Sequence, residues 1–526
     1  MGSQVSGGSV VAQAGRDARI SGSAVVATHG IDIAAGRDLS IEAARNNFSG
    51  SDSYQHKRHD LTGLLTANTL GLDALTGQQH LSISRQKGHS HRESTTLTPS
   101  TVGASAGSLN LEAGRRLEVV ASDLISAEAM RLRGSDVTVA AGQERAEQRS
   151  YHSRRELAVG RVVGGQVVDT AQALYHSAKA ARDADDSRLA AVKAAQAALA
   201  AYTLVQQGSQ VAGNLAEGKP SNSSGSLIKL GTELANTRQR TQQESVEDVA
   251  KPATLISGGK LEIIAERDLE VVGSRLRGTD TDLLAGRDIR FESAQHRSAW
   301  NNQSTSDKAA IGASFNIGEQ TGFTLDLGAS VGKAQGRGSQ VEQANAQLHT
   351  GTLNWHSGRH SQLAGAEIHA ERIDARVGRD LLIVSRQDEL HREQRQRSAG
   401  AVASLCIPPS RHGATVSASG SLAYADSTTL YEGVVNQSGL FAGQGGFGID
   451  VGGTTDLQGA VIDSQAPPER NRLSTERLAF SDIRNRSETT ARSASLSASY
   501  SSSGTLADKK RRWRPTAASV AAYRWR

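Results

Sequence analysis

The chain has 526 residues, and 59 Lys and Arg against 54 Asp and Glu give a net charge of +5, which describes a mixed solvated surface and argues against a strongly basic nucleic-acid binder. Aromatic residues make up only 4% of the chain, too few for a large globular core, whereas a narrow solenoid interior is filled by Val, Ile, Leu and Ala. Cys406 is the only cysteine, which excludes an intramolecular disulfide, and no run of about 18 uncharged apolar residues exists that would span a membrane.

Residues 1–44 contain the pattern that organises the chain. Apolar side chains alternate up to Gly36-Arg37-Asp38, break at a corner and then alternate again, which is typical of two short strands that meet at a sharp bend. The same frame surrounds Gly15-Arg16-Asp17, 21 residues earlier. It returns at Gly286-Arg287-Asp288 and Gly378-Arg379-Asp380, with degenerate copies at Gly114-Arg115-Arg116 and Glu266-Arg267-Asp268 and a weaker corner at Gly134-Ser135-Asp136.

A period of about 20 residues that holds only short strands and turns indicates a solenoid, because it is too short for helical-hairpin repeats or propeller blades. One coil cannot fold alone, since ordering its backbone costs roughly 1–2 kcal/mol per residue while each buried Leu or Ile returns only about 1.5–3 kcal/mol. Stacking places every inward residue on its counterpart about 4.8 Å away. The predicted fold is therefore all-β, a parallel β-helix with Ile33 and Ile263 in its interior.

The corner triplets are predicted to be structural. Glycine allows a left-handed or closely approaching backbone, and the arginine and aspartate are expected to project outward as stacked ladders of opposite charge. The residues predicted for this role are Gly15, Arg16, Asp17, Gly36, Arg37, Asp38, Gly286, Arg287, Asp288, Gly378, Arg379 and Asp380. Calcium binding by the aspartates is the alternative, but it is typical of a short glycine-rich period and not of one near 20 residues.

Polar, charged and Ala-rich segments interrupt the repeats. We expect coils at residues 1–44, 108–144, 251–294, 345–385 and 429–485. Between them we expect an excursion with polar loops at 45–107, an Ala-rich helical insertion and linker at 145–250, a β-hairpin excursion at 295–344, and a polar tract with strands at 386–428. Residues 486–526 are Ser/Thr-rich and basic, and are predicted to form a disordered tail.

The helical insertion rests on Thr170–Val205, where apolar residues recur every three or four positions. We interpret this face as a helical hairpin that packs on itself or on the coils. Attachment to a membrane surface is the alternative.

The patterns for catalysis or ligand binding are weak. His56, His59, His89 and His91 have no acidic or cysteine companions at a fixed spacing, so we interpret them as solvated loop residues and not as metal ligands. The basic run Lys509–Arg514 lacks a folded platform for nucleic acid or an anionic surface. No nucleophile elbow, Walker loop or zinc-protease motif is present, nor the carboxylate cluster that a polysaccharide-cleaving β-helix needs. We therefore predict no catalytic, cofactor or metal site.

Several longer phrases carry a family resemblance. GSQVSGGSVVAQAGRDARISGSAVVATHGIDIAAGRDLSIEAA and GSRLRGTDTDLLAGRDIRFESAQ resemble the haemagglutinin repeats of bacterial filamentous haemagglutinins and contact-dependent growth inhibition effectors. SGLFAGQGGFGIDVGGTTDLQGAVIDS and NRLSTERLAFSDI follow in the expected order, and the resemblance covers most of residues 1–490. It implies a right-handed β-helical shaft within a very long exoprotein that an outer-membrane two-partner transporter secretes. Because no signal peptide and no toxin-like domain is recognisable, we expect an internal or truncated segment.

The resemblance implies a shaft that mediates adhesion or projects a distal module, with a cell-surface receptor or glycan of host or neighbouring cells as partner. The full-length parent is then expected to be secreted and located at the cell surface, without a cofactor, specific nucleic acid or membrane span. Two alternatives are a delivery stalk for a growth-inhibition toxin and a polysaccharide-active β-helix enzyme. A third is an unexported remnant without activity.

Overall fold

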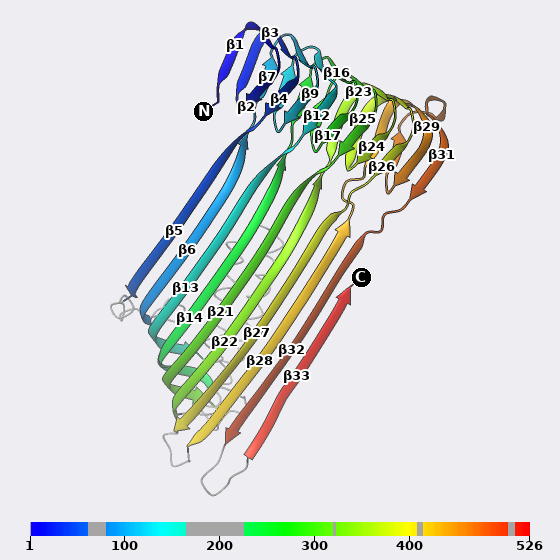
Figure 1. The fold of residues 1–526 in the computed structure, drawn as a ribbon. Helices are drawn as coiled ribbons and strands as arrows, with labels where there is room; N and C mark the ends of the chain where they lie inside the picture. The colour runs from blue at the N-terminus through cyan, green and yellow to red at the C-terminus, as the bar shows by residue number, and fades with distance from the viewer. Residues whose placement is uncertain are drawn as a thin grey trace.

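The computed structural model describes residues 2–60, 80–164, 226–318, 322–407, 414–502 and 511–525. Apart from one short 3-10 helix, Pro468–Arg470, the regular structure of these residues consists of β-strands, which confirms the predicted all-β class. The strands form a 23-stranded sheet that winds through stacked coils and a 10-stranded sheet that extends from one side of the stack (Figure 1). Within the described ranges, no helix has the length and apolar character needed to cross a bilayer.

The coils are built from short strands that pair in parallel with the equivalent strand of the next coil. For example, β3 pairs with β8, and Ile33 lies opposite Leu111. The coil strands are β1 (Gln4–Ala14), β2 (Ala18–Ser21), β3 (Ala24–Ala35), β4 (Asp38–Glu42), β7 (Thr101–Ala104), β8 (Ser108–Ala113), β9 (Arg116–Val120), β10 (Asp123–Ser126), β11 (Met130–Gly134), β12 (Asp136–Ala140), β15 (Thr254–Ser257), β16 (Lys260–Ala265), β17 (Leu269–Val272), β18 (Arg275–Arg277), β19 (Asp280–Ala285), β20 (Ile289–Glu292), β23 (Ala346–Ser357), β24 (Ser361–Ala364), β25 (Ala366–Val377), β26 (Leu381–Val384), β29 (Gly439–Gln458), β30 (Val461–Ser464) and β31 (Arg472–Ser481).

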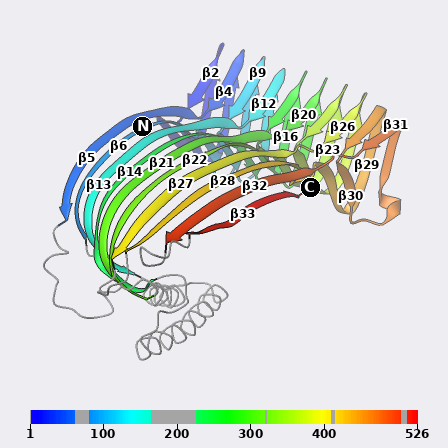
Figure 2. The same ribbon diagram turned by 90° about the horizontal axis from the view of Figure 1, so that it is seen from below.

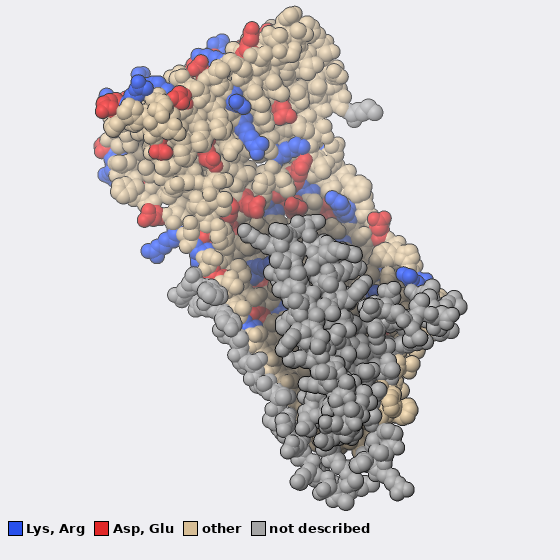
Figure 3. Space-filling model, turned by 180° about the vertical axis from the view of Figure 1, so that it is seen from behind, with Lys and Arg blue, Asp and Glu red and all other residues tan. Residues whose placement is uncertain are grey.

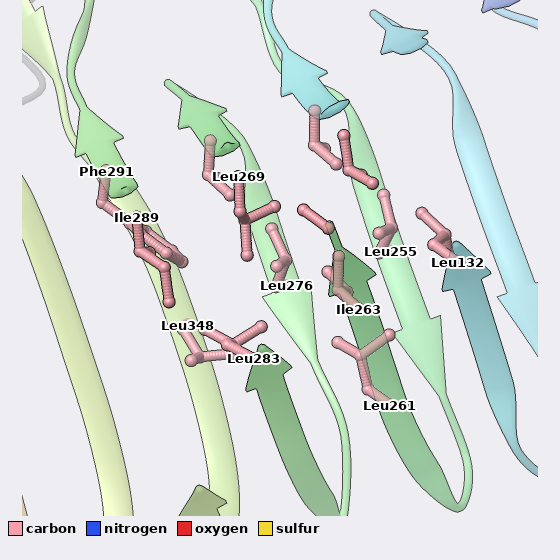
Figure 4. Packing of buried hydrophobic residues seen from close by; sticks show 14 of the residues in the cluster. Leu132, Leu255, Leu261, Ile263, Leu269, Leu276, Leu283, Ile289, Phe291 and Leu348 are labelled. Carbon is pink, nitrogen blue, oxygen red and sulfur yellow. The ribbon is translucent and has the colours of Figure 1, made fainter. Parts of the chain in front are cut away.

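Inward side chains form columns along the axis of the stack. In one column, consecutive coils contribute Ile33, Leu111, Leu132, Ile263 and Leu283. Each of these side chains is at most 4% exposed. Figure 4 shows side chains of this core directed into the interior from neighbouring strands. Since each buried Leu or Ile contributes about 1.5–3 kcal/mol, the column stabilises the stack as the repeat predicts.

The second sheet consists of five long antiparallel hairpins, and we call it the hairpin sheet. Its strands are β5 (Ala44–Asp60), β6 (His80–Thr98), β13 (Gly142–Gly164), β14 (Ser226–Lys251), β21 (Ala294–Gly318), β22 (Gly322–Ala344), β27 (Asp388–Ile407), β28 (Thr415–Gly433), β32 (Arg486–Ser502) and β33 (Arg511–Trp525), which lie side by side in chain order. The longest, β14, has 26 residues, against about 5–6 in a typical strand. Figure 2 shows that the hairpin sheet is curved along its strands.

One hairpin follows every second coil. Hairpins begin after β4, β12, β20, β26 and β31. The strands that alternate with these in one pairing column, β9, β17, β24 and β29, lead directly into the next coil. The reason is geometric. Stacked coils rise by about 4.8 Å each, and two neighbouring hairpin strands occupy about twice that distance. Two coils therefore provide the axial length that one hairpin needs.

The direct turns between coils use a left-handed residue. Gly22 has φ of 55°, and the equivalent turn after β9 places the non-glycine Ala121 at φ of 47°. The other direct turns use Gly273, Gly365 and Gly459. A left-handed residue is thus found where one coil leads directly into the next, because the chain must turn sharply there.

Three segment expectations differ from the structure. The tail expected to be disordered contains β32 and β33, which pair in the hairpin sheet. The insertion expected at 145–250 begins and ends with the strands β13 and β14, while Thr170–Val205 lies outside the described residues. The polar excursion at 45–107 is the β5–β6 hairpin, and coils resume already at Thr101. The polar runs suggested loops because much of these strands is solvated on both faces.

Candidate functional site

The corner triplets stack into one column on the outside of the coils. The backbone N–H of a corner arginine donates to the carbonyl of the corner residue one coil away over 2.7–2.8 Å; the pairs are Arg37 with Arg16, Arg115 with Arg37, Arg267 with Ser135, Arg287 with Arg267, Arg359 with Arg287 and Arg379 with Arg359. The column includes Gly358-Arg359-His360, which the sequence pattern missed. Its spacing of 20 residues from Gly378 was the available signal, and a histidine in place of the aspartate obscured it.

The aspartates bond the coil that follows. Asp17 Oδ1 accepts from Arg37 Nε at 2.7 Å and from the Asp38 N–H at 3.3 Å, and Asp38 Oδ1 accepts from Arg115 Nε at 2.9 Å. The Arg37 guanidinium holds the pKa of the Asp17 carboxyl below its usual value, and Arg115 does the same for Asp38. Figure 3 shows acidic and basic side chains interleaved over the coils.

Later corners keep some of these ion pairs and replace others. Asp268 Oδ1 lies 3.6 Å from Arg287 Nε and accepts from the Asp288 N–H at 3.2 Å. The buried Asp288 accepts from the N–H of His360 at 3.1 Å. Asp380 accepts from the Thr454 N–H at 2.8 Å and lies 3.2 Å from His360 Nδ1. In the described residues, the feature common to these aspartates is therefore a bond to a backbone N–H one coil further on.

Close approach between coils favours glycine at most corners, although a Cβ on Gly15 would meet nothing within 4 Å and Glu266 occupies the same place in another corner. A Cβ on Gly36 would lie 2.3 Å from the carbonyl oxygen of Gly15, and one on Gly378 would lie 2.2 Å from that of Gly358. Neither has positive φ, so the left-handed conformation is not what selects glycine here. The corner side chains thus bond the neighbouring coils, both through backbone N–H groups and through the arginine of the next corner.

The hairpin sheet carries a different kind of surface. Directly paired residues of an antiparallel sheet share a face, so the registers assign side chains to faces across all the strands. One face, which we call the apolar face, collects large apolar side chains that are 37–65% exposed; they are Ile83, Leu157, Val159, Leu234, Ile311, Phe323, Leu325, Leu327, Val331, Leu405, Ile407, Val416, Leu422 and Leu496. Surfaces on which many exposed apolar side chains gather are typical of interaction sites.

Basic side chains border the apolar face on the side of the coils. Lys57, Arg85, Arg155 and Arg238 lie directly opposite one another on four neighbouring strands and share that face, and Asp307 ends the row. We call these four residues the basic row. Like charges in direct cross-strand register repel, so the row favours an external anion.

Sequence reasoning missed both features. The alternation of Phe323, Leu325 and Leu327 was visible, but not its register with Leu405, which lies 80 residues after Leu325. Only cross-strand pairing reveals that separate, weakly alternating segments combine into one surface.

The histidines interpreted as loop residues lie in strands: His56 and His59 in β5, and His89 and His91 in β6. His91 Nε2 lies 3.0 Å from Glu93 Oε1. In the part of the chain that the structure describes, no group of three or more His, Cys, Asp or Glu side chains is placed to hold a metal. The basic run at the C-terminus falls partly outside the described residues, and its last part forms the start of β33.

The hemagglutinin repeat family matches residues 1–60, 81–220 and 234–401, a range that contains coils and hairpins alike. This chain belongs to that family. Toxin CdiA of Yersinia pestis is 30% identical over 490 residues, which are 92% of this chain and 14% of that protein. The tRNA nuclease CdiA of Escherichia coli O6:K15:H31 (strain 536 / UPEC) is 30% identical over 524 residues, 97% of this chain and 15% of that protein.

The deoxyribonuclease CdiA of Yersinia pseudotuberculosis serotype O:3 (strain YPIII) is 30% identical over 481 residues, 89% of this chain and 42% of that protein. This hemagglutinin-repeat chain spans about a seventh of the length of the first two relatives. No solved structure matches it.

Proposed function

We propose that this chain is a shaft segment of a secreted bacterial surface exoprotein, in which a right-handed β-helical coil stack presents the hairpin sheet to the envelope of a host cell or a neighbouring bacterium. The observation that carries the proposal is the apolar face with its basic row. The parent protein would leave the cell through an outer-membrane two-partner transporter.

Among the roles of such a shaft, the relatives support delivery. They are named toxin, tRNA nuclease and deoxyribonuclease CdiA, and this chain matches only part of each. We propose that the segment acts as a stalk for a module elsewhere in its parent, and that the segment itself is not an enzyme. Adhesion through the apolar face would be the step that brings the parent to its target.

The chemistry of the apolar face fits a lipid surface that carries phosphate headgroups. Exposed Leu, Ile, Val and Phe side chains gain about 25 cal/mol for each Å² that acyl chains cover. The basic row lies at the edge of this surface, where phosphates would sit, and each Lys or Arg contributes on the order of 1 kcal/mol near an anionic membrane. The two terms act on one face of one sheet, so they add.

Co-sedimentation with vesicles tests the proposal. The full chain is expected to bind phosphatidylglycerol-containing vesicles more strongly than pure phosphatidylcholine vesicles. Replacing Leu325 and Leu327 by Ser should weaken binding to both kinds, while Arg85→Gln with Arg155→Gln should weaken only the anionic preference. Val402 is 45% exposed on the opposite face, so Val402→Ser is the matched control. Absence of vesicle binding by the unmodified 526-residue chain would refute the proposal.

A further inference from the structure

The face of the hairpin sheet opposite the apolar face holds a hollow of about 520 Å³ near the middle of the strands. Its wall residues come from β14, β21, β22, β27, β28 and β32. Besides Arg395, Asp426 and Arg492, the residues that line it are neutral, and we define the amide groove by Gln243, Asn302, Ser304, Gln394, Gln396 and Ser427.

The register explains why a hollow forms there. Gln243, Asn302, Gly336 and Gln394 lie directly opposite one another on consecutive strands, and Ser427 continues the row. The central position is a glycine, and a Cβ built on it would meet nothing closer than 3.9 Å. The amides on either side therefore stand as walls about 9.6 Å apart, two strand spacings, over a floor of bare backbone.

An aromatic ring lies beside this row. Trp300 is two residues from Asn302, so it shares the face of the groove, and it is paired with Gly338. Its indole lies across that glycine, because a Cβ there would be only 2.3 Å from the Trp300 Cζ2 atom. The side chain is half-buried, so part of it is exposed on the same face as the amides, although Trp300 does not itself line the hollow.

We propose that the amide groove binds a neutral oligosaccharide. Carboxamides offer a donor and an acceptor in one plane, which matches the paired hydroxyls of a hexose, and the indole provides an apolar surface for the C–H face of the sugar ring. With its amide turned so that the oxygen faces Arg392, which satisfies both groups, Gln394 accepts from Arg392 Nε at 3.2 Å. That contact directs the Gln394 NH2 group to the other side as a donor.

The inference deepens the proposed function, since it names a partner class for the same projected sheet and rests on that function for its biological setting. It uses the opposite face, however. Loss of vesicle binding and loss of sugar binding are therefore separable: variants of Leu325 and Leu327 test the first, and variants of the amide groove test the second.

The experiment titrates the full chain with maltohexaose, chitohexaose and lacto-N-neotetraose as neutral probes and a hyaluronan hexasaccharide as an anionic one, followed by saturation-transfer NMR and calorimetry. We expect binding of at least one neutral probe and a tenfold or greater loss of affinity in Gln243→Leu with Gln394→Leu. Gln242 is the matched control, because it is the same residue type on the same strand and faces the other way. Gln242→Leu should retain parental affinity.

Trp300→Phe should retain part of the affinity that Trp300→Ala loses, since the smaller ring still offers an apolar face. Circular dichroism and thermal melts of each variant establish that the sheet is intact. Failure of all neutral probes to bind would overturn the assignment. So would unchanged affinity in the double variant, or preferential binding of a Gly-Ser decapeptide in place of the sugars.

Discussion

Deletion of one coil offers a direct test of the coupling between the coils and the hairpin sheet. Removing residues Thr101–Ser122 deletes β7, β8 and β9 and leaves one coil between the β5–β6 and β13–β14 hairpins. The deletion keeps the coil register, because Asp123 pairs with Thr101 and Thr101 pairs with Ala24. Asp123 would then occupy the place of Thr101 on the stack.

The axial distance between the two hairpins then falls from about 9.6 Å to about 4.8 Å, although two strands still have to fit. The β6–β13 junction runs from Arg145 to Gly160 and contains 16 residue pairs. At roughly one backbone hydrogen bond per pair and about 1 kcal/mol net for each, the junction contributes on the order of 10–16 kcal/mol. The shortened chain must lose that pairing or break its coils, so the β5–β6 hairpin should detach.

Hydrogen exchange measured by mass spectrometry provides the readout. In the one-coil deletion, amides of β6 and of the facing edge of β13 should exchange much faster than in the unmodified chain, while core amides around Ile263 remain protected. Deletion of Ala44–Ala141 is the matched control, because it removes one hairpin together with two coils and keeps the two-to-one ratio. If the amides of β6 and β13 are protected from exchange as well in the one-coil deletion as in the unmodified chain, the geometric explanation is refuted.

Three further predictions concern the coils. Ile33 is 4% exposed, so Ile33→Asp should lower the free energy of unfolding by several kcal/mol, whereas the exposed Arg37→Ala should change the urea midpoint little; equal effects would contradict the assignment of inward and outward positions. Ala121→Gly should increase the free energy of unfolding by up to about 1 kcal/mol and so raise the thermal midpoint, because φ of 47° strains a residue with a Cβ; a lower midpoint would show that the lost methyl contact outweighs the relieved strain. The folded-state pKa values of Asp17 and Asp38 are lowered by their bonds to Arg37 and Arg115, so the stability that these bonds contribute is present above the unfolded pKa near 3.8 and is lost as pH falls through the folded values. Urea titrations at pH 2–6 should show this loss of stability, which should be less steep in high salt and smaller in Asp17→Asn.

The coils were predictable because each obeys the same local rule. Alternation on both sides of a corner fixes which residues face inward, and the burial of Ile33 and Ile263 follows from that alternation alone. The period near 20 residues then specifies stacking without any knowledge of other contacts. The corner at Gly358 was missed although its spacing fits, and there His360 takes the place of the aspartate and contacts Asp380.

One hairpin was predictable from local pattern, since the β-hairpin expected at 295–344 corresponds to β21 and β22. The hairpin sheet as a whole was not. Its strands are polar on both faces near the coils, as in the run Arg386–Arg397, and such runs suggest solvated loops. Their partners are fixed by where the coils place the next hairpin and not by the strands' own composition. The groove depends on this as well, since Gln243, Asn302 and Gln394 come together only through the register of three hairpins.

The two-to-one ratio of coils to hairpins also bears on how the proposed shaft would respond to force. A sheet attached at one edge strand would hinge about that strand, but this one is tied to the stack at every hairpin, once for every two coils. Sliding of the hairpin sheet along the axis of the stack would have to shear several coil junctions together, and each junction is held by parallel backbone pairing and by the buried columns. The apolar face and the amide groove therefore keep a fixed position along the axis of the stack. If the chain acts as the stalk that we propose, an axial force on the sheet passes to several coils at once.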